Sequence, residues 1–221
     1  MENEVQLLFS NHEASEAAYA ESIEYLRTHL DLQSTIDQHT LAYSVLDELI
    51  PQPVTRLFSG HDFPVTESFS ELRNSLELAL QGFYNHAFFS NRSTLELGML
   101  GLYFSDQAVD KSEISNWGKS RERTPGIKQL LPKLANFKPF TEAEGRFGLL
   151  TRVGDISENL GAYVHTRGYK HSSTGQRHSN VNRFLEDPFR RCVNSLEQVC
   201  AVVIFAFTTV RLNFRAVNLT H

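Results

Sequence analysis

The chain has 221 residues, of which 41% are apolar and 21% charged, ordinary proportions for a folded globular protein. Its 16 Phe and 7 Tyr supply bulky core material, so the composition excludes a disordered chain. The N-terminus is acidic where a secretory signal would be basic. The longest apolar run, residues 199–210, is shorter than the roughly 20 residues that span a bilayer. We therefore expect a soluble, cytoplasmic protein without a membrane span.

Charge is distributed unevenly along the chain, although the net charge is only -5. Residues 1–50 carry a balance of -9, and residues 165–221 carry a balance of +5. Such asymmetry indicates either an anionic partner for the basic end or packing of the acidic first helices over that end. The sequence leaves both alternatives open.

Apolar residues recur at every third or fourth position along most of the chain, which is typical of amphipathic helices. No segment alternates with a period of two, so we expect no substantial strand. The pattern predicts an all-α bundle of about seven helices. In chain order, the apolar stripes run through Tyr19, Ile23, Leu26 and Leu30; Leu41, Val45 and Leu49; Phe69, Leu72, Leu76, Leu80 and Phe83; Leu95, Met99, Leu102 and Tyr103; Ile127, Leu130, Leu131 and Leu134; Leu149, Val153, Ile156, Leu160 and Tyr163; and Phe189, Val193, Leu196, Cys200, Val203 and Phe207.

Several polar residues have the spacing that marks the start of a helix. Serine is followed three residues later by an acidic residue at 34–37, 68–71 and 93–96, the spacing of a capping box. Thr124-Pro125 predicts the start of a short helix, and Asp187-Pro188 predicts the start of the last one. The segment 107–124 is polar and shows no comparable stripe.

The last predicted helix is apolar on all sides around 199–207, so we expect it at the centre of the bundle. In a helix its two cysteines, Cys192 and Cys200, would lie about 12 Å apart, too far for a disulfide. We interpret them as buried thiols. A long helix from about Thr141 to Val164 is predicted before it. We expect one domain over residues 1–221, with an acidic helical part at 1–50.

One pattern occurs twice, at residues 73–84 and 92–103, as Arg-x-x-Leu-Glu-Leu-x-x-x-Gly-x-Tyr. A chain break at Ser90-Asn91 would allow two antiparallel helices to turn this pattern inward. We interpret the duplication as a helical hairpin that uses one packing solution twice.

Each copy also places Arg and Glu four residues apart, at Arg73 and Glu77 and at Arg92 and Glu96. This spacing allows an ion pair on one helical turn. The pair is either a solvated surface pair or a partly buried pair that lines a cleft. The flanking leucines favour partial burial, especially for Arg92 and Glu96.

The segment 165–180 is rich in histidine and in basic residues. Histidine acts as an acid or base near neutral pH, and Arg and Lys bind phosphates, so the segment suits an RNA or nucleotide phosphate. The alternative is a solvated basic loop. The histidines match no familiar zinc spacing and no cysteine accompanies them, so we expect no metal, and no cofactor motif is present. The histidines are His165, His171 and His178, and the residues expected to bind phosphate are Arg167, Lys170 and Arg177.

The stretch 159–168, with Tyr-Val-His ending at His165, resembles the end of a helix in bacterial helical proteins of the HEPN group. Those proteins carry an earlier Arg-x-x-Leu-Glu helix, matched here by residues 92–96. The resemblance covers roughly residues 66–165 and implies a HEPN-like helical core over 66–214. It also implies a dimeric, metal-independent ribonuclease of a bacterial defence or toxin system.

The HEPN signature is Arg, four to six residues, then His. It matches here only at Arg56 to His61 and at Arg215 to His221, neither of which suits a helix in a dimer cleft. A related bundle without nuclease activity is therefore equally consistent with the sequence.

Our leading hypothesis is that His165 is the acid or base and that Arg92 and Glu96 position it. The alternative is a non-enzymatic interaction module that binds a protein partner through its acidic or apolar helices. A homodimer through the Phe-rich helices is a third hypothesis.

Overall fold

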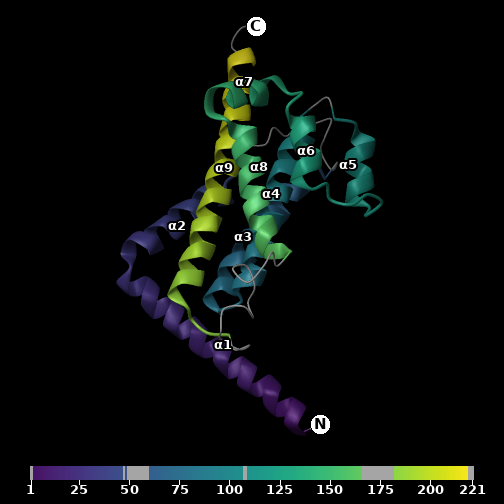
Figure 1. The fold of residues 1–221 in the computed structure, drawn as a ribbon. Helices are drawn as coiled ribbons and strands as arrows, with labels where there is room; N and C mark the ends of the chain where they lie inside the picture. The colour runs from purple at the N-terminus through teal and green to yellow at the C-terminus, as the bar shows by residue number, and fades with distance from the viewer. Residues whose placement is uncertain (1, 47, 49–59, 107–108, 166–181, 219–221) are drawn as a thin grey trace.

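The described residues form nine α-helices and no strand, which confirms the predicted all-α bundle (Figure 1). The structure is a computed structural model that describes residues 2–46, 48, 60–106, 109–165 and 182–218, with residues 2–9 and 210–218 as backbone only. The helices are α1 (Glu2–Thr28), α2 (Leu30–Ser44), α3 (Phe63–Leu80), α4 (Tyr84–Ser105), α5 (Lys111–Gly118), α6 (Ile127–Leu134), α7 (Lys138–Phe147), α8 (Leu149–Val164) and α9 (Glu186–Asn218).

Two local features raise the number of helices above the expected seven. The long helix predicted from about Thr141 is broken at Gly148, whose φ of 62° is left-handed and ends α7 before α8 begins. The polar segment contains α5, which Asp110 starts by accepting a hydrogen bond of 2.8 Å from the backbone N–H of Ser112. Both features depend on single residues rather than on an apolar stripe.

Helix α9 lies at the centre of the fold, as predicted. It contacts α2, α3, α4, α7 and α8, and Figure 1 shows it in yellow along the length of the molecule. By length and composition, its segment Glu186–Thr209 is apolar enough to cross a membrane, but half of that segment's most apolar window is buried inside the bundle. A core helix enclosed by other helices has the same composition.

Helices α3 and α4 form the predicted antiparallel hairpin, but its turn lies elsewhere. The chain reverses at Gly82 (φ 80°), where a Cβ would come within 2.8 Å of the Arg183 backbone. Ser90 and Asn91 instead lie buried inside α4. The matching glycine of the second copy, Gly101, is helical and lies against Val65 of α3. The two copies therefore do not share one packing solution. The glycine of the first copy forms the turn, whereas the glycine of the second allows close packing of α4 against α3.

The predicted stripe on the second helix faces solvent. Leu41 and Val45 are 70% and 41% exposed, whereas Tyr43 is 1% exposed. The Tyr43 hydroxyl is hydrogen-bonded to Ser68 of α3, and Ser68 in turn donates to the carbonyl oxygen of Thr94 in α4 at 2.7 Å. This buried hydrogen-bonded junction joins three helices and fixes which face of α2 points inward.

The three predicted capping boxes are wrong as helix starts. Helix α2 begins at Leu30, before Ser34. Ser68 and Ser93 lie inside α3 and α4, which begin at Phe63 and Tyr84. The Ser68 hydroxyl is used between helices rather than at a helix end.

Helix α1 follows an outlying path. Figure 1 shows its N-terminal part running beyond the bundle, while α2 crosses α9. Near its C-terminal end, Tyr25 donates a hydrogen bond of 2.8 Å to Glu186 at the start of α9, and Arg190 lies over the Tyr25 ring. Ser15 also accepts a hydrogen bond from Asn182. The acidic first helix thus packs against the start of α9 and the residues before it, through these polar contacts and through the Tyr25 ring, which lies against Phe184 and Phe189.

The start of α8 is capped from outside the helix. Glu144 of α7 accepts hydrogen bonds from the backbone N–H groups of Leu150 (2.6 Å) and Thr151 (3.2 Å), and from the Thr151 hydroxyl (2.5 Å). These hydrogen bonds hold the pKa of Glu144 below its ordinary value of 4.5, the Thr151 hydroxyl contributing most. Gly148, the residue before α8, has no side chain that could accept hydrogen bonds from the N–H groups of the first turn.

We predict that Glu144→Ala destabilises the protein by about 1 kcal/mol, the usual cost of losing a helix N-cap. Because the folded-state pKa is lowered, the carboxylate contributes its full stability above pH 4.5, and that contribution is lost as the pH falls below this value. Thermal unfolding at pH 7 and pH 3.5 measures both effects. Glu142→Ala, which removes only an exposed partner of Lys138, is the control. An equal loss at both pH values for Glu144→Ala would contradict the capping role.

Candidate functional site

Of the two predicted Arg–Glu pairs, the structure contains one. Arg92 Nε lies 3.0 Å from Glu96 Oε1, and the two side chains are 27% and 18% exposed. The expected partial burial of this pair is confirmed. Arg73 and Glu77 are both exposed, and no ion pair joins them.

The Arg92–Glu96 pair lies between three helices. Glu96 Oε1 lies 3.6 Å from the position of a Cβ on Gly126, the residue that precedes α6, where a carboxylate interacts favourably with the helix N-terminus. Arg92 Nη1 lies 3.9 Å from the corresponding position on Gly161 of α8. The pair thereby links α4 to α6 and α8.

His165 ends α8 on the same side as this pair. Its backbone N–H donates to the Gly161 carbonyl at 3.0 Å, and its side chain is exposed. At about 100° per residue, His165 lies only about 40° around the helix from Gly161 and about 6 Å further along it. Arg92, Glu96 and His165 therefore share the α6 side of α8. The predicted phosphate ligands Arg167, Lys170 and Arg177 lie outside the described residues.

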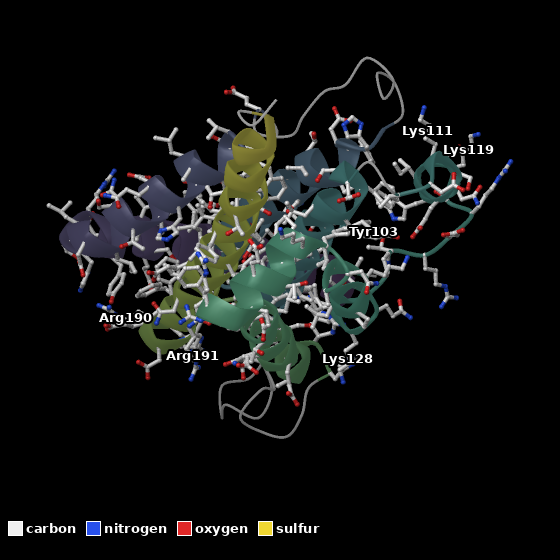
Figure 2. All side chains as sticks on the ribbon, turned by 90° about the horizontal axis from the view of Figure 1, so that it is seen from above. Tyr103, Lys111, Lys119, Lys128, Arg190 and Arg191 are labelled. Carbon is white, nitrogen blue, oxygen red and sulfur yellow. The ribbon has the colours of Figure 1, made fainter. Side chains whose placement is uncertain are left out.

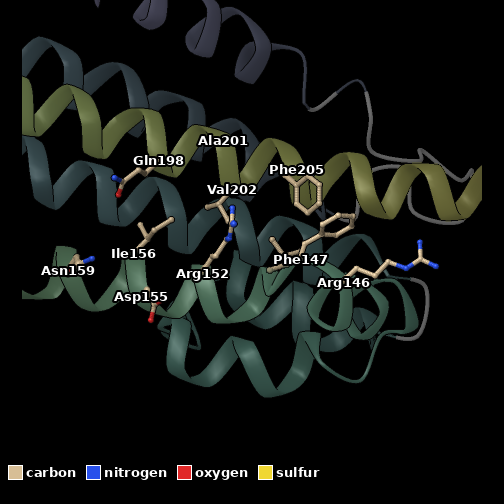
Figure 3. A pocket seen from close by; sticks show the side chains of 11 residues that line it. Arg146, Phe147, Arg152, Asp155, Ile156, Asn159, Gln198, Ala201, Val202 and Phe205 are labelled. Atoms are coloured by element: carbon tan, nitrogen blue, oxygen red, sulfur yellow. The ribbon is translucent and has the colours of Figure 1, made fainter.

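A groove that the sequence did not predict runs along the opposite side of α8, between α8 and α9 (Figure 3). Its wide part has a volume of about 760 Å³. A smaller hollow of about 200 Å³ continues it towards the end of α8 and shares Ile156, Asn159 and Gln198 with it. We call the two parts together the α8–α9 groove. The residues that matter below are Arg146, Phe147, Arg152, Asp155, Asn159, Gln198 and Phe205 in the wide part, and Phe88, Tyr163, Arg191, Asn194 and Gln198 in the narrow part.

Three arginines that form no ion pair among the described residues line the α8–α9 groove. Within the part of the chain that the structure describes, none of Arg146, Arg152 and Arg191 forms an ion pair, and the Nε of Arg191 is buried without a hydrogen-bond partner. Arg190, the next residue along α9, is paired with Glu186 at 3.1 Å. A buried N–H group without a partner is costly, and native proteins rarely leave one unsatisfied. Arg191 lines the narrow part of the groove and is the candidate anion-binding group there.

The charges of the groove are oriented. In Figure 3 the Arg152 side chain extends towards Val202 of α9, whereas the Asp155 carboxylate points away from α9. Figure 2 places Arg191 on the side of the molecule opposite Lys111, which begins α5, and Lys119, which follows it. The arginines of the α8–α9 groove are thus separate from the lysines at the ends of α5.

Aromatic side chains mark both ends of the groove. In the wide part, Phe147 and Phe205 are 54% and 37% exposed and meet edge to face, with ring centroids 5.3 Å apart. In the narrow part, the Phe88 and Tyr163 rings stack at 3.8 Å. The amides of Asn159 and Gln198 lie between the two ends and offer both donors and acceptors. Positive charge, aromatic rings and amides together suit a ligand that carries phosphates and flat rings.

Other reactive groups offer less. Cys192 and Cys200 are free and buried, as expected, and burial raises the pKa of the Cys200 thiol to about 12. Such a thiol stays protonated and unreactive. Among the described residues, no cluster of three or more His, Cys, Asp or Glu side chains could hold a metal ion.

Comparison of the chain with protein-family models, with curated proteins and with solved structures found no significant match.

Proposed function

We propose that the protein binds the phosphates of RNA or of a nucleotide in the α8–α9 groove. The observation that carries this proposal is the set of three arginines without ion-pair partners in the described chain, one of them with a buried, unsatisfied Nε. A phosphate oxygen at one of these guanidinium groups would be held by a charge-assisted hydrogen bond, which is shorter and stronger than a neutral one.

The chemistry of the groove favours phosphate over other anions. A guanidinium presents several N–H donors in a planar fork that matches phosphate and carboxylate groups. The rings of Phe147 and Phe205 lie in the same groove. A ligand that carries bases beside its phosphates uses both features, whereas a simple inorganic anion would leave the aromatic end in water.

Catalysis is a separate proposal. His165 lies about 160° around α8 from Tyr163, which lines the narrow part of the groove, so it does not face the groove directly. Arg92, which is paired with Glu96, lies against Gly161 on the other side of α8 from the groove. HEPN-like ribonuclease activity in a bacterial defence or toxin system, and the homodimer that goes with it, stay predictions from the sequence.

We predict that Arg152→Ala and Arg191→Ala each weaken binding by roughly 10- to 100-fold, because hydrogen bonds between charged groups contribute about 1.5–3 kcal/mol. Fluorescence anisotropy with a labelled RNA 10-mer and with a labelled adenine dinucleotide measures the affinity. Lys111→Ala and Lys119→Ala each remove the same charge at the two ends of α5, far from the groove, and should have little effect. Failure of both probes to bind, or equal losses for the α5 variants, would refute the groove as the phosphate site.

If His165 is an acid or base in RNA cleavage, the wild type shortens purified total RNA and His165→Ala leaves it intact. Gel electrophoresis of the RNA after incubation measures this. His86→Ala, which changes another exposed histidine on α4, is the control. Equal RNA integrity with wild type and His165→Ala would exclude the enzymatic role and leave binding as the function.

A second candidate function is a protein-interaction module that binds a partner through the exposed leucines of α2. Leu30 and Leu41 are 68% and 70% exposed and, at about 100° per residue, lie within about 20° of each other around the helix. The residues between them on that face, Gln33, Ser34 and Asp37, are polar and exposed, so a partner would contact two leucines within a polar surface. Removing residues 1–50 is too severe a test, because Tyr43 belongs to the core.

The double substitution Leu30→Ser and Leu41→Ser leaves the core intact and tests this candidate. We expect the variant to melt at the wild-type temperature but to lose any self-association or partner binding seen with wild type. Sedimentation velocity of both proteins at several concentrations measures self-association, and pull-down from lysate measures partner binding. A variant that behaves as wild type in both would rule out this face of α2.

A further inference from the structure

The ends of the α8–α9 groove differ in chemistry and are well separated. Arg191 lines the narrow end, and the wide end presents Phe147 and Phe205 with exposed rings. Arg191 and Phe205 are both on α9, fourteen residues apart, which is about 21 Å along the helix axis. One nucleotide is too short to contact both ends, so a ligand that does so must be longer.

We infer that the groove binds a nucleotide of dinucleotide size, with a phosphate at Arg191 and a base stacked on Phe147 or Phe205. This inference rests on the proposed function and chooses between the two ligands that the proposed function leaves open. The ligand is a small molecule or a very short oligonucleotide rather than a long RNA.

The size of the groove supports a small ligand. Its wide part of about 760 Å³ lies within the range of about 300–1,000 Å³ that is usual for small-molecule pockets. The adjoining hollow adds about 200 Å³ around Arg191. Three arginines are enough to bind two phosphates, the number that pApA and NAD each carry.

The charge of the whole protein also disfavours a long polymer. The net charge is -5, so phosphates that extend beyond the groove meet a protein that is negative overall. Polyanion binding requires cations along the whole path of the backbone, because affinity grows with each phosphate that is neutralised. Within the groove the cations are three, with Arg146 and Arg152 at the wide end beside the two phenylalanines and Arg191 at the narrow end.

The aromatic end has the features of a base-stacking site. Phe147, at the end of α7, and Phe205, on α9, keep much of their ring surface exposed although they touch each other. A base that covers this surface gains stacking energy with any base type. Asn159 and Gln198 line the path from these rings towards Arg191 and can bond to base edges or sugar hydroxyls.

Isothermal titration calorimetry with four probes tests the inference: AMP, the 5′-phosphorylated dinucleotide pApA, NAD and an RNA 10-mer. We expect pApA or NAD to bind at least tenfold more tightly than AMP, and the 10-mer to bind no more tightly than pApA. Tighter binding of NAD than of pApA identifies a pyrophosphate-linked ligand, and the reverse order identifies a short oligonucleotide. An RNA 10-mer that binds more than tenfold more tightly than both would overturn the inference.

Variants at the two ends show whether one ligand reaches both. Phe147→Ala should weaken dinucleotide binding by about 5- to 100-fold, the effect of one lost base–aromatic stack, and Arg191→Ala should weaken it as well. AMP should respond to only one of these two variants, since it cannot reach both ends. Phe147→Trp should keep the wild-type affinity, because it keeps an aromatic ring at this position. The fluorescence of the new tryptophan should be quenched when a base stacks on it. Phe89→Ala, which removes a ring that is 47% exposed on α4 and does not line the groove, is the control.

The results separate the two proposals. If Phe147→Ala and Phe205→Ala bind the dinucleotide as wild type does, while Arg152→Ala and Arg191→Ala still weaken it, phosphate binding stands and the stacking site is wrong. If none of the four probes binds, the proposed function fails, and this inference fails with it.

Discussion

The need to cover α9 determines how this protein is built. Val199, Val203 and Ala206 of this helix are fully buried, and α2, α3, α4, α7 and α8 all lie against it. Burial of such a helix is the dominant favourable contribution to folding, at about 25 cal/mol per Å² of apolar surface. The cover is incomplete along one line, between α8 and α9, where Phe205 stays partly exposed. The candidate ligand site is this gap, so the fold and the site have one origin.

The helical periodicity of the sequence is sufficient to predict an all-α fold with a central last helix, because burial on one face imposes a period of 3.6 residues. It does not identify which face of a helix points inward. Leu41 and Val45 form a genuine stripe, yet Tyr43 is buried instead, because its hydroxyl finds a partner in Ser68 of another helix. The hairpin turn at Gly82 and the break at Gly148 depend on single glycines with positive φ. Composition does not distinguish these from the helical Gly101.

The sequence predicts less of the candidate site than of the fold. The leucines around Arg92 and Glu96 predict that this pair is partly buried, and the structure confirms it. The α8–α9 groove brings together residues of four helices, α4, α7, α8 and α9, from Phe88 to Phe205, so no local sequence pattern predicts it. Its only local signal is an arginine beside a phenylalanine that stays exposed, at Arg146 and Phe147. The absence of ion-pair partners for its arginines is a property of the folded chain.

Photo-crosslinking tests most directly whether the α8–α9 groove is the ligand site. The protein is irradiated with a thiouridine-containing dinucleotide and with a thiouridine-containing RNA, and the crosslinked residues are mapped by mass spectrometry. We expect crosslinks within residues 146–163 and 191–205, which line the groove, and their loss when unlabelled ligand competes. Crosslinks confined to α5, α6 or α1, or crosslinks within the groove that unlabelled ligand does not displace, would contradict the assignment.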